Sequence, residues 1–291
     1  MKEIAIIGST ASGKTALSLE IANKTNSIIL SLDSLCVYKE IEIASAKPTL
    51  EERGDIIHFG IDEVYPNEEF DVIKFIELYK KAKEYAFKND KNLIIVGGTG
   101  FYLKALIDGL SQGIETKIKL DIPQEDAYDL LYKIDKEYME KIEKNDRYRI
   151  EKAYAIYKQT SLGPTQYFQK NPKIAVAKDL KIFEILWDKE ELKNRILKRT
   201  KIMINSGIID EVIFLEKKYT REPNCMSSIG IIETLEYLDG KLTKQELEEK
   251  ISANTAKLAK RQNTFNKGQF LDKTSNIIEN LNSDIIKYFS L

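Results

Sequence analysis

The sequence of 291 residues contains little cysteine and little histidine, and neither sign of charge dominates it. Its two cysteines, Cys36 and Cys225, are too few for a disulfide framework, and their spacing does not match a zinc site. Such sparse use of cysteine is typical of a reducing compartment. The 45 Lys and Arg residues nearly balance the 46 Asp and Glu residues. A surface that binds a polyanion must therefore arise from local clusters of basic residues.

Long hydrophobic runs are also lacking. No apolar run approaches the roughly 20 residues that a membrane-spanning helix needs. The N-terminal segment MKEIAIIGST is too short and too soon interrupted to be a signal peptide. We therefore expect a cytoplasmic protein with no membrane partner. The sequence contains neither internal repeats nor low-complexity tracts, and its length allows one large domain or two modest ones.

Short apolar segments alternate with helical segments in the first part of the chain. The apolar periodicity predicts helices over 14–25 and 71–90, strands over 3–7, 27–33 and 92–98, and a further strand somewhere within 55–64. Short, almost wholly apolar strands that alternate with helices are typical of a parallel sheet covered on both faces.

The pattern changes from about residue 123. The following segment is helical, polar and rich in Tyr and Lys, and it contains no candidate strand. We interpret 113–178 as a helical insertion domain. A returning strand is predicted over 179–187, followed by helices over 189–206, 208–218, 227–237 and 244–266. The expected fold is therefore α/β, with a P-loop NTPase-like parallel sheet flanked by helices and built from 1–112 and 179–291.

The segment GSTASGKT follows the first predicted strand and matches the pattern G-x-x-x-x-G-K-[ST]. Its glycines allow backbone N–H groups to turn toward an anion, and the next helix adds its positive end. Lys14 adds a charge, and Thr15 adds a hydroxyl ligand for Mg²⁺. The pattern is typical of nucleotide-binding and ATP-binding proteins, although it also occurs by chance in surface turns. We expect the whole segment to bind phosphate: Gly8, Ser9, Thr10, Ala11, Ser12, Gly13, Lys14 and Thr15.

ATP hydrolysis does not follow from this loop. In the usual P-loop NTPase a second apolar strand ends in an Asp that helps to hold Mg²⁺. The matching segment here, LIIVGGTG, ends in glycines and Thr99, which suits either a second anion-binding turn or a simple tight turn. The nearest acid is Asp33, at the end of the second predicted strand. Because the carboxyl ends of parallel strands meet at the ligand crevice, Asp33 suits a general base, or else a cap for the following segment.

Several further segments resemble the motifs of one family, in the order in which that family carries them. They are DSLCVYKEIEIASAKPT (33–49), HFGIDEVYPNEEF (58–70), VGGTGFYLKALIDGL (96–110), NDRYRIEKAYAIYKQT (145–160), NRILKRTKIMINSGIIDEV (194–212) and AKRQNTF (259–265). With GSTASGKT, they identify the sequence as a member of the tRNA dimethylallyltransferases, or IPP transferases.

The resemblance implies transfer of a dimethylallyl group from dimethylallyl diphosphate to an adenosine beside the anticodon of tRNA. The phosphate loop then binds a diphosphate that is being expelled, with Mg²⁺ as the cofactor. By the same resemblance, Asp33 accepts the proton of the amine and Thr99 contacts the oxygens of the diphosphate. Arg199 grips the diphosphate, and Arg195, one helical turn away, matches another recurrent position.

The resemblance also implies contacts with the anticodon stem-loop of tRNA, some of them made by the helical insertion 113–178. The target base must leave its stack to reach a buried site, and RNA is read most readily in single-stranded loops. The chain is expected to act as a monomer. The candidate tRNA contacts are Asp33, Ser34, Leu35, Cys36, Asp146, Arg147, Arg149, Lys257, Lys260, Arg261 and Gln262.

The sequence departs from the family pattern at several positions. Cys36 stands where the family usually has Gln, and the segment 112–123 lacks an expected Arg, for which Lys117 or Lys119 is a candidate substitute. Such changes indicate a divergent member of the family. His58 is the only histidine and is assigned no catalytic role. Two alternatives stay open: a P-loop kinase of small molecules, and a non-catalytic tRNA-binding relative.

Overall fold

The structure, a computed structural model, describes residues 1–111 and 119–290. It divides into two compact units: Met1–Lys104 with Ala177–Leu291, and Ala105–Val176. The first boundary of the predicted insertion, between 112 and 113, lies outside the described residues, as does the candidate Lys117. Within the described residues, no helix is both long enough and apolar enough to cross a membrane.

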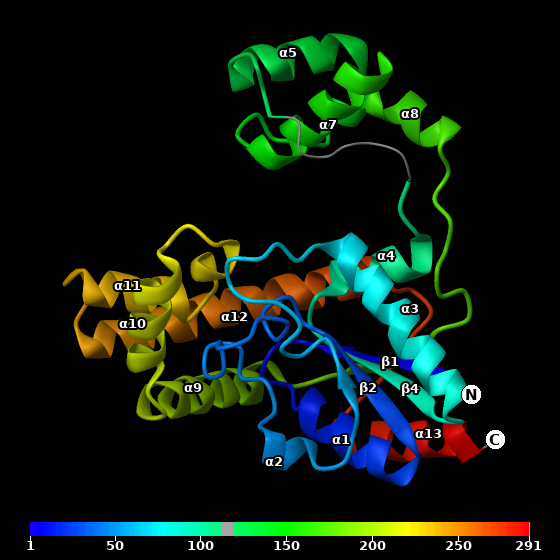
Figure 1. Cartoon of the computed structure of the whole chain (residues 1–291), viewed down its shortest axis with the longest axis vertical. Coiled ribbons are helices and arrows are strands. Elements are labelled where there is room, and N and C mark those ends of the chain that lie inside the picture. Colours follow the sequence, from blue (N-terminus) through cyan, green and yellow to red (C-terminus); the bar gives the residue numbers. More distant parts are fainter. Residues whose placement is uncertain (112–118, 291) are drawn as a thin grey trace. The chain divides into compact units, whose positions relative to one another are not determined.

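The first unit is built around a parallel sheet of six strands in the order β3-β2-β4-β1-β5-β6 (Figure 1). The strands are β1 (Glu3–Gly8), β2 (Ser27–Leu32), β3 (His58–Phe59), β4 (Asn92–Gly97), β5 (Lys181–Ile185) and β6 (Thr274–Asn276). Ile6 of β1 pairs with Val96 on one side and with Phe183 on the other. Because β5 follows the insertion in sequence, the sheet is assembled from discontinuous segments. The predicted P-loop-like α/β fold is confirmed.

Helices cover both faces of the sheet. Helices α1 (Lys14–Lys24) and α13 (Ile278–Ser290) pack on one face, where Leu17 and Leu281 join Ile4 and Ile6 in one apolar core. Strand residues alternate between faces, so Ala5 and Ile7 point to the opposite side. Helix α3 (Val72–Lys88) lies on that opposite side (Figure 1).

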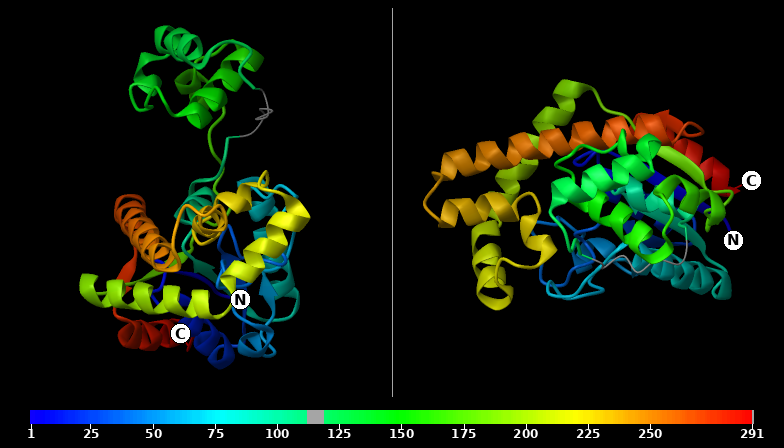
Figure 2. Two further views of the ribbon diagram at one scale, coloured as in Figure 1. Left: turned by 90° about the vertical axis from the view of Figure 1, so that its left-hand side faces the viewer. Right: turned by 90° about the horizontal axis from the view of Figure 1, so that it is seen from above.

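A second apolar core joins the irregular segment after β2 to the helices that follow β5. These helices are α9 (Lys189–Asn205), α10 (Ile208–Tyr219), α11 (Ile231–Leu238) and α12 (Lys244–Gln269), with a short 3₁₀ turn η1 (Asn224–Ser227) before α11. Val37 and Ile41 pack against Ile208, Val212 and Leu247 in this core. Helices α9 and α12 lie side by side (Figure 2). The segment that carries Asp33 is thus fixed against the C-terminal helices.

The secondary structure differs from the expectations, or adds to them, in a few places. The strand predicted within 55–64 is β3, which is short because the chain turns at Gly60, whose φ is 79°. The helix predicted over 227–237 begins at Ile231, after Gly230 with φ 95°. The sequence pattern did not indicate β6 or α13. Strand β6, TSN, is polar and very short, so it carries no apolar alternation.

The second unit is helical. It contains α5 (Gln124–Ile134), α6 (Lys136–Met139), α7 (Arg147–Thr160) and α8 (Pro164–Lys170), which follow α4 (Gly100–Asp108) in the chain. Leu131, Met139 and Ile150 are fully buried in its own apolar core. The two ends of the unit meet in an antiparallel bridge between Leu110 and Ile174. Gly109 permits this approach, because a Cβ there would lie 1.9 Å from the Ile174 carbonyl oxygen.

Candidate active site

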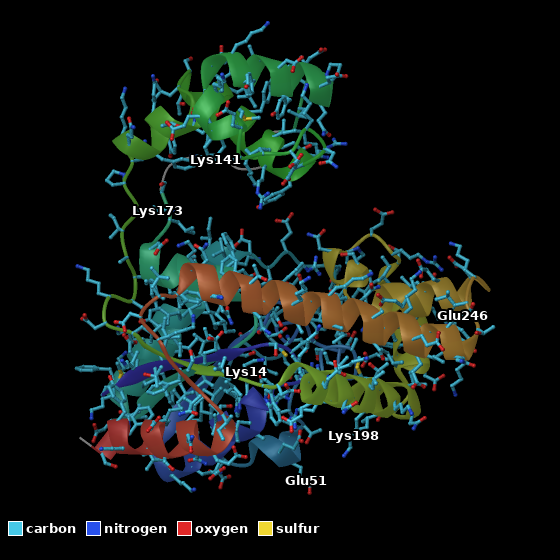
Figure 3. The ribbon with its side chains drawn as sticks, turned by 180° about the vertical axis from the view of Figure 1, so that it is seen from behind. Lys14, Glu51, Lys141, Lys173, Lys198 and Glu246 are labelled. Atoms are coloured by element: carbon cyan, nitrogen blue, oxygen red, sulfur yellow. The ribbon has the colours of Figure 1, made fainter. Side chains whose placement is uncertain are left out.

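The phosphate loop joins β1 to α1 and closes around the amino group of Lys14. The Lys14 Nζ donates hydrogen bonds to the carbonyl oxygens of Gly8 at 3.0 Å and Ser9 at 2.6 Å. Gly13 has φ 88°, a conformation that favours glycine. Figure 3 shows Lys14 inside the unit, whereas Glu51 of α2 (Leu50–Arg53) and Lys198 of α9 lie near its edge. The loop thus has the form that phosphate binding requires.

Burial, together with the charge of Arg199, lowers the pKa of Lys14 to about 8. A buried ammonium that bonds only to carbonyl and hydroxyl groups is costly, and an anion in the loop would offset that cost. The same cause, burial, lowers the pKa of Arg199, while Asp33 acts in the opposite direction. Two cations therefore lie close together at the loop, where a polyanionic ligand is stabilised by both.

Asp33 and Thr99 follow the adjacent strands β2 and β4 and are joined through one turn. The Oδ1 of Asp33 accepts the backbone N–H of Leu35 at 2.8 Å, so Asp33 caps the turn that follows it. The hydroxyl oxygen of Thr99 accepts the N–H of Ser34 at 3.2 Å. Among the described residues, the second carboxylate oxygen of Asp33 accepts no hydrogen bond and stays available to a substrate. The capping interpretation and the general-base interpretation of Asp33 are therefore compatible.

The turn after β4 offers fewer free donors than its glycines suggest. The N–H of Thr99 donates to Leu32 O at 3.1 Å, and the N–H of Gly100 donates to Gly98 O at 3.0 Å. Both donors are thus used within the protein. The hydroxyl of Thr99 therefore becomes the main candidate in this turn for contact with an anion.

Helix α9 carries two arginines with different surroundings. A guanidinium nitrogen of Arg199 lies 3.4 Å from the Thr10 hydroxyl, at the inner side of the phosphate loop. Arg195 is exposed: its Nε donates to Ala11 O at 2.7 Å, and its guanidinium stacks 4.3 Å from the ring of Trp187. The Trp187 indole N–H in turn donates to Ser12 O at 2.8 Å. Arg195 and Trp187 thus hold the outside of the loop, while Arg199 faces its interior.

Three adjoining cavities bring most of the candidate residues together. The central one is lined by Lys14, Thr15, Asp33, Cys36 and Arg199. A second cavity, of about 400 Å³, also includes Asp33 and Arg199 and adds Ser34, Leu35 and Thr99. A third opens on the loop side and is lined by Ala11, Ser12, Gly13, Lys14, Thr15, Arg195 and Arg199. Arg199 lines all three cavities, so the expected loop, base and hydroxyl surround one continuous region.

Gln262 of α12 connects two loops of this region. Its Oε1 accepts the backbone N–H of Thr10 at 2.7 Å, and its Nε2 donates to Gly98 O at 3.1 Å. A Cβ at Gly98 would lie 2.3 Å from that Nε2, so glycine is needed for the approach. A residue expected to contact tRNA therefore binds the backbone of the phosphate loop. No local pattern could have indicated this contact between residues so far apart in the sequence.

Cys36 is buried rather than presented at the surface. Its thiol lies 3.9 Å from Ser45 O, and burial raises the pKa of the thiol well above its usual value. It lines the central cavity together with His58, whose Nδ1 lies 2.8 Å from Ile56 O. Burial lowers the pKa of His58, which favours the neutral ring.

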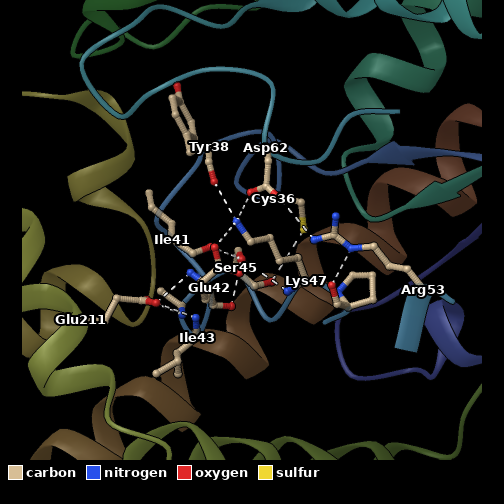
Figure 4. Close-up of polar contacts among 12 residues, drawn as sticks. Cys36, Tyr38, Ile41, Glu42, Ile43, Ser45, Lys47, Arg53, Asp62 and Glu211 are labelled. Atoms are coloured by element: carbon tan, nitrogen blue, oxygen red, sulfur yellow. Dashed lines mark hydrogen bonds and ion pairs between the residues drawn. The ribbon is translucent and has the colours of Figure 1, made fainter. Parts of the chain in front are cut away.

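The segment that carries Asp33 and Cys36 is fixed by charged residues that the sequence did not single out. Figure 4 shows Lys47 pointing toward Asp62 and the carbonyl of Tyr38, and Glu211 pointing at the backbone of residues 42–44. The Lys47 side chain is only 1% exposed and also pairs with Glu42 at 2.8 Å. Lys47 and Glu211 both lie in motifs that resemble the family, but neither spacing nor residue type reveals these partners.

A family model described as IPP transferase matches residues 36–269 of this chain. This chain belongs to the IPP transferase family. It is 82% identical over its whole length to the tRNA dimethylallyltransferase of Aliarcobacter butzleri (strain RM4018), and the alignment covers 100% of both proteins. The resemblance inferred from the motifs is confirmed.

Solved structures of the IPP transferase family share this fold. The tRNA isopentenylpyrophosphate transferase of Bacillus halodurans aligns with a TM-score of 0.75 at 28% identity, over 99% of this chain and 95% of that one. A eukaryotic dimethylallyltransferase acting on tRNA aligns with a TM-score of 0.81 at 28% identity, over 96% of this chain and 74% of that one.

Most of the remaining candidates of this IPP transferase lie on α12 of the first unit, or on α7 and its N-terminal cap in the second. Lys257, Lys260 and Arg261 are exposed on α12 and line a groove with Phe265. In the second unit, Arg149 pairs with Asp146 at 2.7 Å, and Asp146 caps the start of α7. Arg147 pairs with Glu151 at 2.8 Å. Lys119 is exposed. These side chains are available at the surface, and their contacts with RNA stay predictions.

Proposed function

We propose that this chain transfers the dimethylallyl group of dimethylallyl diphosphate to the exocyclic amine of the adenosine 3′ of the anticodon (position 37) in tRNA, releasing diphosphate. The observation that carries the proposal is that Lys14, Asp33 and Arg199 line one cavity. That cavity combines cations for an anionic leaving group with a carboxylate for an attacking amine. Membership of the IPP transferase family supports the same reaction.

The chemistry explains why the phosphate loop is needed. The exocyclic amine of adenine is a poor nucleophile, because its lone pair is delocalised into the ring. The allylic carbon must therefore be activated, and its bond to oxygen breaks readily when the departing diphosphate is stabilised. Lys14 and Arg199 supply positive charge at the place where negative charge develops on the leaving group. The phosphate is thus the leaving group, and no phosphoryl group is transferred.

Asp33 is positioned to receive the proton of the amine. Its Oδ1 is held by the N–H of Leu35 at 2.8 Å, which leaves the other oxygen for the substrate. Thr99 is oriented by the N–H of Ser34 at 3.2 Å, so its hydroxyl hydrogen is free to point at a diphosphate oxygen. The two groups line the same cavity of about 400 Å³, which supports a shared role toward one substrate.

The donor set fits Mg²⁺. Mg²⁺ usually binds through one or two carboxylates, substrate phosphates and water. The Thr15 hydroxyl and the Asp33 carboxylate line the central cavity, while the described residues contain no cluster of three or more His, Cys, Asp or Glu side chains. We therefore infer that Thr15 holds the ion together with the diphosphate. When bound, Mg²⁺ neutralises part of the charge of the leaving group.

The substrate tRNA is proposed to lie on the basic residues Lys257, Lys260 and Arg261 of α12 and on Asp146, Arg147 and Arg149 of α7. Ser34 and Leu35 line the cavity that adjoins Thr99, where they would meet the flipped base. Cys36 lies deeper, in the central cavity. The monomeric state, the cytoplasmic location and ATP binding stay predictions.

The decisive experiment is mass analysis of tRNA nucleosides after incubation with the protein, Mg²⁺ and dimethylallyl diphosphate. We expect one adenosine to gain a dimethylallyl group, with diphosphate released in equal amount. Phosphorylation of a small molecule by ATP without prenyl incorporation would instead favour the kinase alternative. Binding of tRNA without either product would favour a non-catalytic relative.

A further inference from the structure

The residues 44–48, which we call the wall segment, border all three cavities. Ala44 and Ser45 line the cavity that contains Thr99, while Ser45, Ala46 and Pro48 line the central cavity. Ala46 and Pro48 also line the cavity on the loop side. The wall segment belongs to no helix or strand. The N–H of Ala46 donates to Ile43 O at 3.1 Å and shapes a local turn, while charged side chains hold that turn against the rest of the unit.

Glu211 of α10 supplies one fixed point. Its Oε2 accepts the N–H groups of Glu42 and Ile43, each at 2.7 Å, and its Oε1 accepts the N–H of Ala44 at 2.9 Å. One carboxylate thus satisfies three successive backbone donors, the last of which belongs to Ala44, the first residue of the wall segment (Figure 4). Hydrogen bonds to an ionised acceptor are stronger than neutral ones, so this contact defines the turn.

Glu211 also connects the wall segment to Arg199. Helix α9 ends at Asn205 and α10 begins at Ile208, so Arg199 and Glu211 lie on consecutive helices. The start of α10 is fixed by the buried residues Ile208 and Val212, which pack with Ile41. Any shift of the turn at 42–44 would therefore move the wall segment relative to the arginine that lines the same cavities.

Lys47 fixes the other end of the wall segment. Its buried ammonium donates to Tyr38 O at 3.1 Å and pairs with Asp62, and Asp62 also pairs with Arg53 at 3.2 Å. Arg53 in turn donates to Pro48 O at 2.8 Å. The wall segment is thus held at its end by Lys47 and Arg53, and at its beginning by Glu211.

We propose that Glu211 is a positioning residue that keeps the wall segment closed over the reacting carbon and so excludes water during prenyl transfer. This inference rests on the proposed function. In productive transfer, the bond from the allylic carbon to the diphosphate oxygen breaks, a bond to the adenine nitrogen forms, and the amine proton passes to Asp33. If water enters, its oxygen bonds to the carbon instead, giving dimethylallyl alcohol and diphosphate, and a proton passes to solvent.

The test compares Glu211→Gln with Asp210→Asn. Glutamine can keep the bonds to Glu42 and Ile43 through its oxygen, but its amide nitrogen then faces the N–H of Ala44. Asp210 is the exposed neighbour in the same first turn of α10, so its variant loses the same charge without touching the wall segment. Released diphosphate and prenylated tRNA are measured in the same reaction.

We expect equal amounts of the two products from the unmodified protein and from Asp210→Asn. Glu211→Gln should release at least about twice as much diphosphate as prenylated tRNA, because water reaches the carbon. This ratio does not depend on the fraction of protein that is folded. Glu211→Asp keeps the carboxylate on a shorter side chain, so its ratio of diphosphate to prenylated tRNA should lie between those of the unmodified protein and Glu211→Gln. This variant replaces Glu211→Gln in the test if Glu211→Gln does not fold.

An unchanged ratio in the Glu211 variants would overturn the inference and leave the proposed function intact. An equal rise in Asp210→Asn would also overturn it, because the charge of the helix start would then be the cause. Absence of prenyl transfer by the unmodified protein would reject the proposed function itself, and the inference with it.

Discussion

The Oε1 of Gln262 lies 2.7 Å from the backbone nitrogen of Thr10, across 252 residues of sequence. The same amide donates to Gly98 O, so a single side chain of α12 fixes the phosphate loop relative to the turn that carries Thr99. Helix α12 also presents the basic residues expected to bind tRNA. Gln262 therefore connects the loop that we expect to bind the donor with the helix that we expect to bind tRNA.

Replacing Gln262 by Met should weaken donor binding and leave tRNA binding unchanged. Methionine has a similar length but bonds neither to Thr10 nor to Gly98, and an unpaired, partly buried N–H costs about 1–3 kcal/mol. We expect the KM for dimethylallyl diphosphate to rise about tenfold, since about 1.4 kcal/mol corresponds to a factor of ten. Steady-state kinetics and tRNA binding measured separately would check this.

Asn263→Leu is the matched control for that variant, because Asn263 is exposed on the same helix. Asn263→Leu should leave both the KM for dimethylallyl diphosphate and the affinity for tRNA unchanged. If Gln262→Met instead weakens tRNA binding and spares donor binding, then Gln262 contacts RNA, as the sequence predicted, and its bond to Thr10 has no role in donor binding.

Replacing Asp33 by Asn should slow prenyl transfer by a factor of about 10²–10⁴, the usual contribution of a general base. Asparagine keeps an oxygen that can accept the N–H of Leu35, so the turn is preserved. Binding of tRNA should persist. A single-turnover measurement with saturating donor isolates the chemical step. Transfer at the unmodified rate would remove the assignment of Asp33 as the base.

The sequence predicts the sheet well because its strands are apolar and its phosphate loop has a known geometry. β1, β2 and β4 coincide with the predicted strands to within one residue at each end. β6 was not predicted, because a three-residue polar strand has no hydrophobic pattern and forms only where β5 already offers an edge.

The sequence predicted the site residues that belong to recognisable motifs. It did not predict the residues whose role is to bind the backbone of a distant segment. Lys14, Asp33 and Arg199 follow from motifs, and the structure places them around one cavity. The roles of Gln262 and Glu211 depend on side chains meeting backbone groups more than 160 residues away. Residue type and spacing do not indicate such contacts, because they form only when the helices after β5 pack against the rest of the unit.

The affinity for the donor should depend on pH through Lys14. Burial and the charge of Arg199 lower the pKa of Lys14 to about 8, so the ammonium predominates below pH 8 in the free protein. We propose that this charge binds the diphosphate of the donor, so donor binding should weaken as the pH rises through about 8. Titration of the protein with the donor at pH values from about 6.5 to about 9.5, roughly 1.5 units on either side of that pKa, would show the change.

Lys14→Met should bind the donor weakly at every pH, and its donor affinity should no longer depend on pH in this range. In the unmodified protein without donor, the stability should rise with pH, whereas the donor affinity falls. Lys14 binds fewer protons when folded than when unfolded between about pH 8 and its ordinary pKa of 10.5, so the free energy of unfolding gains from this residue as the pH rises through that window. Donor affinity that is constant across pH 8 would contradict the assignment of Lys14 to the diphosphate.

The two arginines of α9 should respond differently to substitution by Met. Arg199 lines all three cavities, and its loss should lower kcat by a factor of about 10²–10³, because it faces the charge that develops on the leaving group. Arg195 is exposed and holds Ala11 O from outside the loop, so its loss should raise the KM for the donor about tenfold with a smaller effect on kcat.

Steady-state kinetics of both variants, with Lys193→Met on the exposed part of the same helix as the control, would separate the roles. Equal losses of kcat for Arg195→Met and Arg199→Met would mean that both guanidinium groups contact the diphosphate in the transition state, and that the stacking of Arg195 on Trp187 is broken when the donor binds.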